Sequence, residues 1–196
     1  MKDLLRNFLI AVVVLAATAG VGRAAAPTFF FGTDIVRLTT RIDDQTGGPA
    51  NFSGSANAVT LRLRGGAHFL PGLDAEVHVV LPQSQTYSNT GGPNSAKTSV
   101  VGVFAKPNFD AGPLNIYALL GYSYAAVDLS GIVKSQQGAS GVAYGAGARY
   151  AITPNVSGSL DYTQYAKEKN TSVSGFAGGA DVDTRAIGVS LIYWFK

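Results

Sequence analysis

The sequence predicts an all-β protein, an eight-stranded antiparallel up-and-down transmembrane β-barrel. Apolar residues alternate with small or polar residues over long segments, and no sustained helical period accompanies them. Short turns alternate with long polar loops in joining these segments. Only 14% of the residues are charged, against about 25% in a typical soluble domain. A spanning barrel accounts for this composition, because only every second residue of each strand faces lipid.

Residues 1–26 are predicted to be a signal peptide. Lys2 and Arg6 precede an apolar run, and small residues follow that run. This is the order of a charged region, an apolar region and a cleavage site in an exported precursor. The apolar run is shorter than the roughly 20 residues that a helix needs to cross a bilayer. We expect cleavage after Ala24 or Ala26.

Residues 27–196 are predicted to form the barrel, and none of their segments is long and apolar enough for a transmembrane helix. Period-2 alternation and the connections between segments place the strands. The predicted strands are residues 28–42, 57–69, 73–81, 98–109, 113–127, 139–152, 155–166 and 182–195.

The first predicted strand departs from a clean alternation. Asp34 falls on the same face as Val36 and Leu38. A charged residue in an apolar face indicates either a β-bulge or a position at the rim of the barrel.

The second and third strands alternate clearly. Val59, Leu61 and Leu63 lie opposite Arg62 and Arg64. The third strand places a row of apolar residues on one face and a row of polar residues on the other: Leu73, Ala75, Val77, Val79 and Leu81 against Asp74, Glu76 and His78. Each strand therefore has an apolar face and a polar face.

The sixth and eighth strands follow the same rule. Val142 and Tyr144 lie opposite Gly145 and Gly147. In the last strand an apolar row lies opposite small or polar residues: Ile187, Val189, Leu191, Tyr193 and Phe195 against Ala186, Gly188 and Ser190. The fourth, fifth and seventh strands are placed by the connections that bound them.

The connections are of two alternating kinds. Short turns with Pro, Gly, Asn or Asp are predicted around Pro71-Gly72, at residues 108–113 and at residues 152–155. The long polar connections are residues 43–56, 82–97, 128–138 and 167–181. The alternation places all long loops at one end of the barrel and both chain termini at the other.

Aromatic residues near the strand ends are typical of an interfacial girdle. The candidates are Phe29, Phe30, Phe31, Tyr122, Tyr124, Tyr150, Tyr162, Tyr165, Tyr193, Trp194 and Phe195. The alternative is a soluble eight-stranded barrel of the lipocalin type, in which the large apolar residues would line the cavity instead.

The chain resembles the small eight-stranded outer-membrane β-barrel family that includes outer membrane protein A and the opacity proteins. The resemblance rests on the signal peptide, the strand layout, the Ile152-Thr153-Pro154-Asn155 turn before Leu160-Asp161-Tyr162, and the run Gly188–Phe195. It implies the outer membrane of a Gram-negative bacterium, outer-membrane lipid and lipopolysaccharide as surroundings, and periplasmic chaperones and the barrel-assembly machinery as partners.

The family's last strand ends in an aromatic residue that the assembly machinery recognises. The resemblance therefore implies an assembly signal at Tyr193, Trp194 and Phe195, with Lys196 after it as a departure from the usual terminal aromatic.

The polar faces predict a charged lumen. The candidate residues of a lumen charge network are Arg62, Arg64, Glu76, His78, Arg149 and Asp161. An eight-stranded barrel is just wide enough for side chains to fill, so these charges should pair across strands. The alternative is an ion path that opens when the pairs exchange partners.

The sequence offers little for catalysis, and we expect no enzyme activity. His68 and His78 are its only histidines, and no Ser stands in a recognisable relation to either. No Cys is present, and no Asp, Glu or His cluster has metal-ligand spacing. We expect no cofactor and no metal, and a net charge of +3 is too mild for a nucleic-acid surface.

The long loops predict a surface-exposed region. Phe52, Tyr87 and Phe176 are the candidate contact residues in them. The expected function is structural, in envelope integrity with exposed loops. The alternatives are a narrow porin-like barrel and an adhesin that binds a host or matrix surface.

Overall fold

The chain forms a barrel of long strands in a computed structural model that describes residues 28–44, 53–87, 94–130, 135–171 and 180–195. The strands are β1 (Thr28–Asp44), β2 (Ser53–Leu70), β3 (Leu73–Tyr87), β4 (Asn94–Ala111), β5 (Leu114–Ser130), β6 (Ser135–Ala151), β7 (Val156–Thr171) and β8 (Ala180–Phe195).

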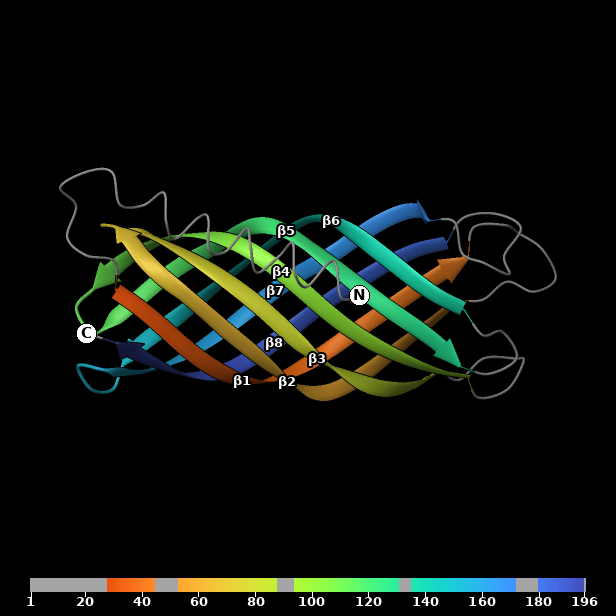
Figure 1. Cartoon of the computed structure of the whole chain (residues 1–196), viewed down its shortest axis with the longest axis horizontal. Coiled ribbons are helices and arrows are strands. Elements are labelled where there is room, and N and C mark those ends of the chain that lie inside the picture. Colours follow the sequence, from red (N-terminus) through yellow and green to blue (C-terminus); the bar gives the residue numbers. More distant parts are fainter. Residues whose placement is uncertain (1–27, 45–52, 88–93, 131–134, 172–179, 196) are drawn as a thin grey trace.

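The sheet is closed. Each strand pairs antiparallel with the next along the chain, and β1 pairs antiparallel with β8. Figure 1 shows the strongly tilted strands wrapping around one axis. Closure pairs the backbone groups of every strand with two neighbours, which removes sheet edges that lipid could not hydrogen-bond. The predicted fold class is confirmed. Among the described residues, no helix is long and apolar enough to cross a membrane.

The two ends of the barrel differ. The turns β2–β3, β4–β5 and β6–β7 lie at the end where β1 begins and β8 ends (Figure 1). We call this the short-turn end and the opposite one the loop end. Gly72 and Gly112 occupy two of these turns at φ of 78° and 65°, a left-handed conformation that glycine adopts without a Cβ penalty.

The strands are longer than the sequence predicted. Every strand extends into a segment that was assigned to a long loop, as in β3, which continues to Tyr87, and β4, which already begins at Asn94. These extensions carry few apolar residues, so alternation of apolar residues alone does not reveal them.

The outer wall is apolar and exposed. Side chains such as Ile35, Val59, Val142 and Val189 point outward, as expected of a barrel that faces lipid. A soluble barrel would have buried them. The outward position of the large apolar residues therefore excludes the lipocalin-like alternative.

Three of the predicted girdle aromatics point inward instead. Phe30 and Tyr165 are buried, and the Trp194 ring packs on Phe30 with centroids 4.7 Å apart. Phe30 and Trp194 alternate with the outward Phe31 and Tyr193, so period 2 places them in the lumen. The girdle prediction is wrong at these positions.

Asp34 needs neither a bulge nor a rim position. The pairing of β1 with β2 is continuous, from Thr28 with His68 to Asp43 with Ser53. Asp34 is buried in the lumen, and Val36 lies on the same inward face. The face of β1 that carries these apolar residues is therefore its lumen face.

The lumen is consequently not polar throughout. Strands β1, β3 and β5 run from the short-turn end to the loop end, and in each of them apolar lumen residues follow charged or polar ones. We call this apolar set, with the residues that pack on it from other strands, the apolar layer. Its members include Val36, Leu38, Val80, Val100, Leu119, Ala125, Ala143 and Val182, and the same buried cluster continues to Phe104, Tyr117 and Tyr165 beside the charged residues.

Candidate functional site

The half of the lumen nearer the short-turn end contains a connected set of charges, which we call the ion-pair layer. Its side chains are fully buried and come from strands that lie on opposite sides of the barrel. The members are Asp34 on β1, Arg62 and Arg64 on β2, Glu76 on β3, Lys106 on β4 and Asp161 on β7.

Arg62 connects β2 to β1 and β7. Its Nε pairs with Asp34 Oδ2, and its Nη2 donates to both oxygens of Asp161, at 2.7 and 2.9 Å. Nη1 donates to the Tyr165 hydroxyl at 3.0 Å and lies 3.3 Å from the Thr163 hydroxyl. All three guanidinium nitrogens therefore have partners.

Arg64 is shared by three carboxylates. Its Nη2 donates to Asp34 Oδ2 at 2.6 Å and to Asp161 Oδ2 at 2.5 Å. Its Nη1 lies 3.1 Å from Glu76 Oε1. Because Asp34 and Asp161 contact both arginines, the four groups form one network rather than separate pairs.

Glu76 extends this network to β4. Its Oε2 accepts a hydrogen bond from Lys106 Nζ at 2.7 Å, and its Oε1 lies 2.7 Å from His78 Nε2. The other nitrogen of His78 lies 3.0 Å from the Tyr165 hydroxyl. His78 is fully buried between these two partners. The Lys106 ammonium also lies 4.0 Å from the centre of the Tyr117 ring.

The ion-pair layer is electrically balanced. Its three cations are Arg62, Arg64 and Lys106, and its three anions are Asp34, Glu76 and Asp161. Isolated buried charges carry a desolvation cost of several kcal/mol each. The balance and the shared hydrogen bonds offset this cost, so the layer can exist in a closed lumen.

Glycine gives the layer its space. A Cβ at Gly188 would lie 2.7 Å from Val36 Cγ1 and 3.0 Å from Arg62 Nη2. A Cβ at Gly147 would lie 2.7 Å from both Asp161 Cβ and Tyr117 Cζ. The large side chains therefore fit because small residues face them across the sheet.

Sequence reasoning did not single out Lys106, Tyr117 or Tyr165 as members of the network. Lys106 alternates with the outward Val103 and Ala105, a pattern that could have placed it in the lumen. Tyr165 was assigned to the girdle, and its hydroxyl instead joins Arg62 to His78.

Arg149 lies outside the ion-pair layer, at the short-turn end. Its guanidinium stacks over the Trp194 ring at 4.6 Å from the centroid. Its Nη1 is 3.6 Å from Asp74 Oδ2. Arg149 therefore contacts neither Asp161 nor Glu76, the anions that the sequence offered as its companions.

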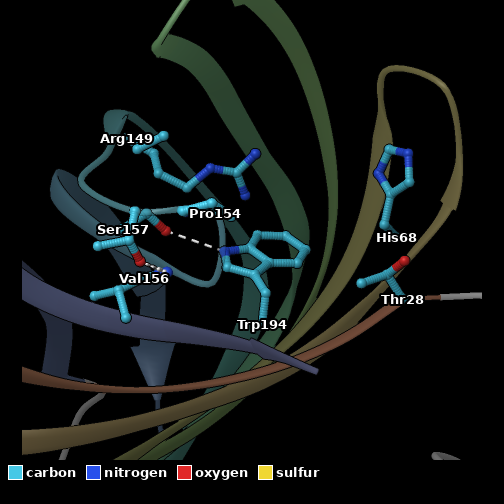
Figure 2. Close-up of a pocket in the computed structure, with 9 residues that line it drawn as sticks. Thr28, His68, Arg149, Pro154, Val156, Ser157 and Trp194 are labelled. Carbon is cyan, nitrogen blue, oxygen red and sulfur yellow. Dashed lines mark hydrogen bonds between the residues drawn. The ribbon is translucent and has the colours of Figure 1, made fainter. Parts of the chain in front are cut away.

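A pocket opens beside Arg149, which we call the short-turn pocket. Its volume is about 280 Å³, and Thr28, His68, Arg149, Pro154, Ser157 and Trp194 are among its lining residues. Figure 2 shows the Arg149 guanidinium above the indole of Trp194, with His68 and Thr28 across the opening. The first residue of β1 and the last residues of β2 and β8 thus meet here.

His68 is held in place by Asp74, whose Oδ1 lies 2.6 Å from His68 Nδ1. The Ser157 hydroxyl in the same pocket accepts a hydrogen bond from Trp194 Nε1 at 3.0 Å. This Ser is therefore engaged with the indole and not with the histidine, an arrangement that differs from a nucleophile and its base. Within the described ranges, no cluster of His, Asp and Glu could hold a metal ion.

The loop residues Phe52 and Phe176 lie outside the described residues, and Tyr87 is the last residue of β3. At the other end, Tyr193 and Phe195 are exposed on the outer wall, and Trp194 points into the short-turn pocket. The proposed terminal signal is therefore divided between two faces of β8.

The closed barrel, its apolar outer wall and its filled lumen define a protein of the transmembrane β-barrel class. The family model for the outer membrane protein beta-barrel domain matches residues 9–195, so the chain belongs to this family. Membership implies the Gram-negative outer membrane. None of the curated proteins matches the chain.

Solved structures share the fold. Neisserial surface protein A is 24% identical with a TM-score of 0.57, over 85% of this chain and 97% of that one. OprG from Pseudomonas aeruginosa is 14% identical with a TM-score of 0.64, over 89% and 98%. Outer membrane protein W of E. coli is 15% identical with a TM-score of 0.56, over 89% and 100%.

Proposed function

We propose that the protein is a non-enzymatic structural component of the outer membrane, which supports envelope integrity and presents its loops at the cell surface. The observation that carries the proposal is the balanced ion-pair layer. It ties β2 to β7 across the lumen through Arg62 and Asp161 and fills the space through which a solute would pass.

Outer-membrane lipid and lipopolysaccharide are the proposed surroundings of the outer wall. Arg37 and Arg185 are exposed on this wall and take part in no ion pair among the described residues. Arg37 pairs in register with Ile187, which belongs to the apolar surface. Arginine beside this apolar surface suits the phosphate groups of lipid headgroups.

Export and assembly are proposed to follow the usual route of such barrels. Residues 1–26 act as the signal peptide, and periplasmic chaperones and the assembly machinery receive the rest. Tyr193, Trp194 and Phe195 serve as the assembly signal. N-terminal sequencing of the protein from the membrane fraction tests this, with Ala25 or Pro27 expected as the first residue.

A narrow ion path is the second candidate, and one observation favours it. Arg64 already contacts Asp34, Glu76 and Asp161, so a small movement could exchange its partners. An adhesin remains the third hypothesis, with Phe52, Tyr87 and Phe176 as contact residues and a host or matrix surface as partner. Alanine at all three positions should abolish surface binding if adhesion is the role.

Deletion of the gene tests the structural role. We expect faster entry of the hydrophobic dye N-phenylnaphthylamine into cells that lack the protein, and recovery on expression of the wild-type chain. Unchanged dye entry together with slower uptake of small ions would contradict the structural role and favour the ion path.

A further inference from the structure

Arg149 has a buried nitrogen, Nη1, that makes no hydrogen bond to any described residue. Its side chain is 13% exposed. Asp74 Oδ2, its ion-pair partner at 3.6 Å, is buried and also lacks a hydrogen bond. Buried polar groups in folded proteins nearly always have partners. This nitrogen lies in a residue that lines a pocket, so it is available to a ligand that accepts hydrogen bonds.

The pocket wall also includes the Thr28 hydroxyl, which can donate. The Asp74 carboxylate can only accept, so His68 Nδ1 donates to it and Nε2 of the neutral ring is an acceptor that adds no donor. The Thr153 hydroxyl accepts from the backbone N–H of Val156 at 3.0 Å, which leaves its own O–H to donate. No acidic residue is among the described residues that line the pocket. The free donors thus favour an anion.

Apolar groups also line the pocket. The Trp194 indole, Pro154 and Val156 are among them. Its volume of about 280 Å³ equals roughly nine water molecules at about 30 Å³ each. A ligand of about nine non-hydrogen atoms with an apolar body fits this space.

We propose that the short-turn pocket binds a small carboxylate with a compact apolar body, which Arg149 and the Thr28 hydroxyl hold by its charged end. The planar guanidinium matches a carboxylate with two parallel hydrogen bonds. A doubly charged phosphate is disfavoured, because Asp74 already lies behind the one arginine. That the pocket faces the periplasm rests on the proposed function, whereas its binding chemistry does not.

The fluorescence of Trp194 tests the proposal directly, because Trp194 is the only tryptophan in the chain and lines the pocket. The chain, folded in an uncharged detergent, is titrated with benzoate and with benzamide, which have the same size but differ in charge. N-acetylalanine represents the end of a peptide, and phosphate represents a simple anion.

We expect a saturable change with benzoate and at least about tenfold weaker binding of benzamide, since charge-assisted hydrogen bonds are lost. If N-acetylalanine binds more tightly than benzoate, the natural ligand is the end of a peptide, and the reverse order indicates a free acid. Equal binding of benzoate and benzamide would overturn the proposal, and so would tighter binding of phosphate than of either carboxylate.

Variants separate the site from general charge effects. Arg149→Gln should weaken benzoate binding about tenfold or more. Arg149→Lys should also weaken it, because an ammonium cannot make the two parallel hydrogen bonds of the planar guanidinium, which we call the fork. Lys97→Gln, at an exposed position of β4, is the matched control and should bind as the wild type. Unchanged affinity in Arg149→Lys would overturn the role of the fork even if Arg149→Gln fails to fold. Dye entry into cells tests the structural role separately.

Discussion

The same eight strands place charged side chains in one half of the lumen and mainly apolar side chains in the other. The ion-pair layer places six charged side chains between opposite strands, and each of them depends on a partner from another strand. The apolar layer packs small and medium side chains such as Val100, Leu119 and Ala125 in its half, beside buried polar side chains such as Gln85 and Thr98. The first layer is stabilised by pairing and the second by volume. A single substitution should therefore fail for a different reason in each half.

Removal of one charge should have the largest effect. Arg62→Ala leaves Asp34 and Asp161 short of a cation in a closed lumen. Breaking a buried ion pair from one side costs about 3–5 kcal/mol. Urea unfolding in detergent micelles measures this loss. Arg37→Ala on the outer wall is the control and should change stability by less than about 0.5 kcal/mol. Equal effects of the two variants would refute the pairing account.

Removal of volume should have the next largest effect. Leu119→Ala opens a cavity in the apolar layer, where Leu119 is fully buried, and should cost about 2–5 kcal/mol. The adjacent Leu120 is 57% exposed on the outer wall, so Leu120→Ala leaves no cavity and should cost clearly less. The same unfolding experiment compares the two, and a larger loss in Leu120→Ala would show that this part of the lumen is not tightly packed.

Added volume should discriminate between crowded and open positions. Gly147→Ala places a Cβ 2.7 Å from Leu160 O and from Asp161 Cβ, and overpacking of this kind costs about 1–3 kcal/mol. Gly141 has nothing within 4 Å of an added Cβ. Gly141→Ala should therefore be neutral or slightly stabilising, because alanine lowers the conformational entropy of the unfolded chain. If both variants lose the same stability, local crowding is not the cause.

The smallest effect is the coupling between Glu76 and Lys106. Glu76→Gln leaves Lys106 without its anion, and Lys106→Met leaves Glu76 without the ammonium that it accepts from. The double variant removes both charges of this hydrogen-bonded pair. A double-mutant cycle on unfolding free energies should give a coupling of about 0.5–3 kcal/mol. Additive effects would show that the two groups act independently and that the layer is less connected than its geometry indicates.

The difference between the layers also explains what the sequence could predict. Period 2 places Arg62, Glu76 and Asp161 on inward faces, because the opposite faces are apolar. It does not state which of them meet, because the closed barrel brings side chains of β2 and β7 together across the lumen, although they lie 99 residues apart in the chain. Hence the contact of Arg62 with Asp161, separated by 99 residues, could not be derived from spacing.

The apolar layer is the reason why the alternation pattern gave a wrong prediction for β1. Val36 and Leu38 resemble a lipid-facing row in the sequence, and they face the lumen together with Asp34. An apolar lumen and an apolar outer wall look the same in one strand, so alternation alone cannot separate them. Trp194 and Tyr165 were misplaced for the same reason, since an aromatic side chain near a strand end suits either face.

A planar-bilayer recording of the purified wild-type protein tests the central claim, that the ion-pair layer closes the lumen. Because these charges are fully buried and paired with one another across the lumen, we predict no stepwise conductance above the baseline. Stepwise conductance of the wild-type protein would contradict this account, and loss of the steps in Glu76→Gln would then assign the path to exchange of partners around Arg64.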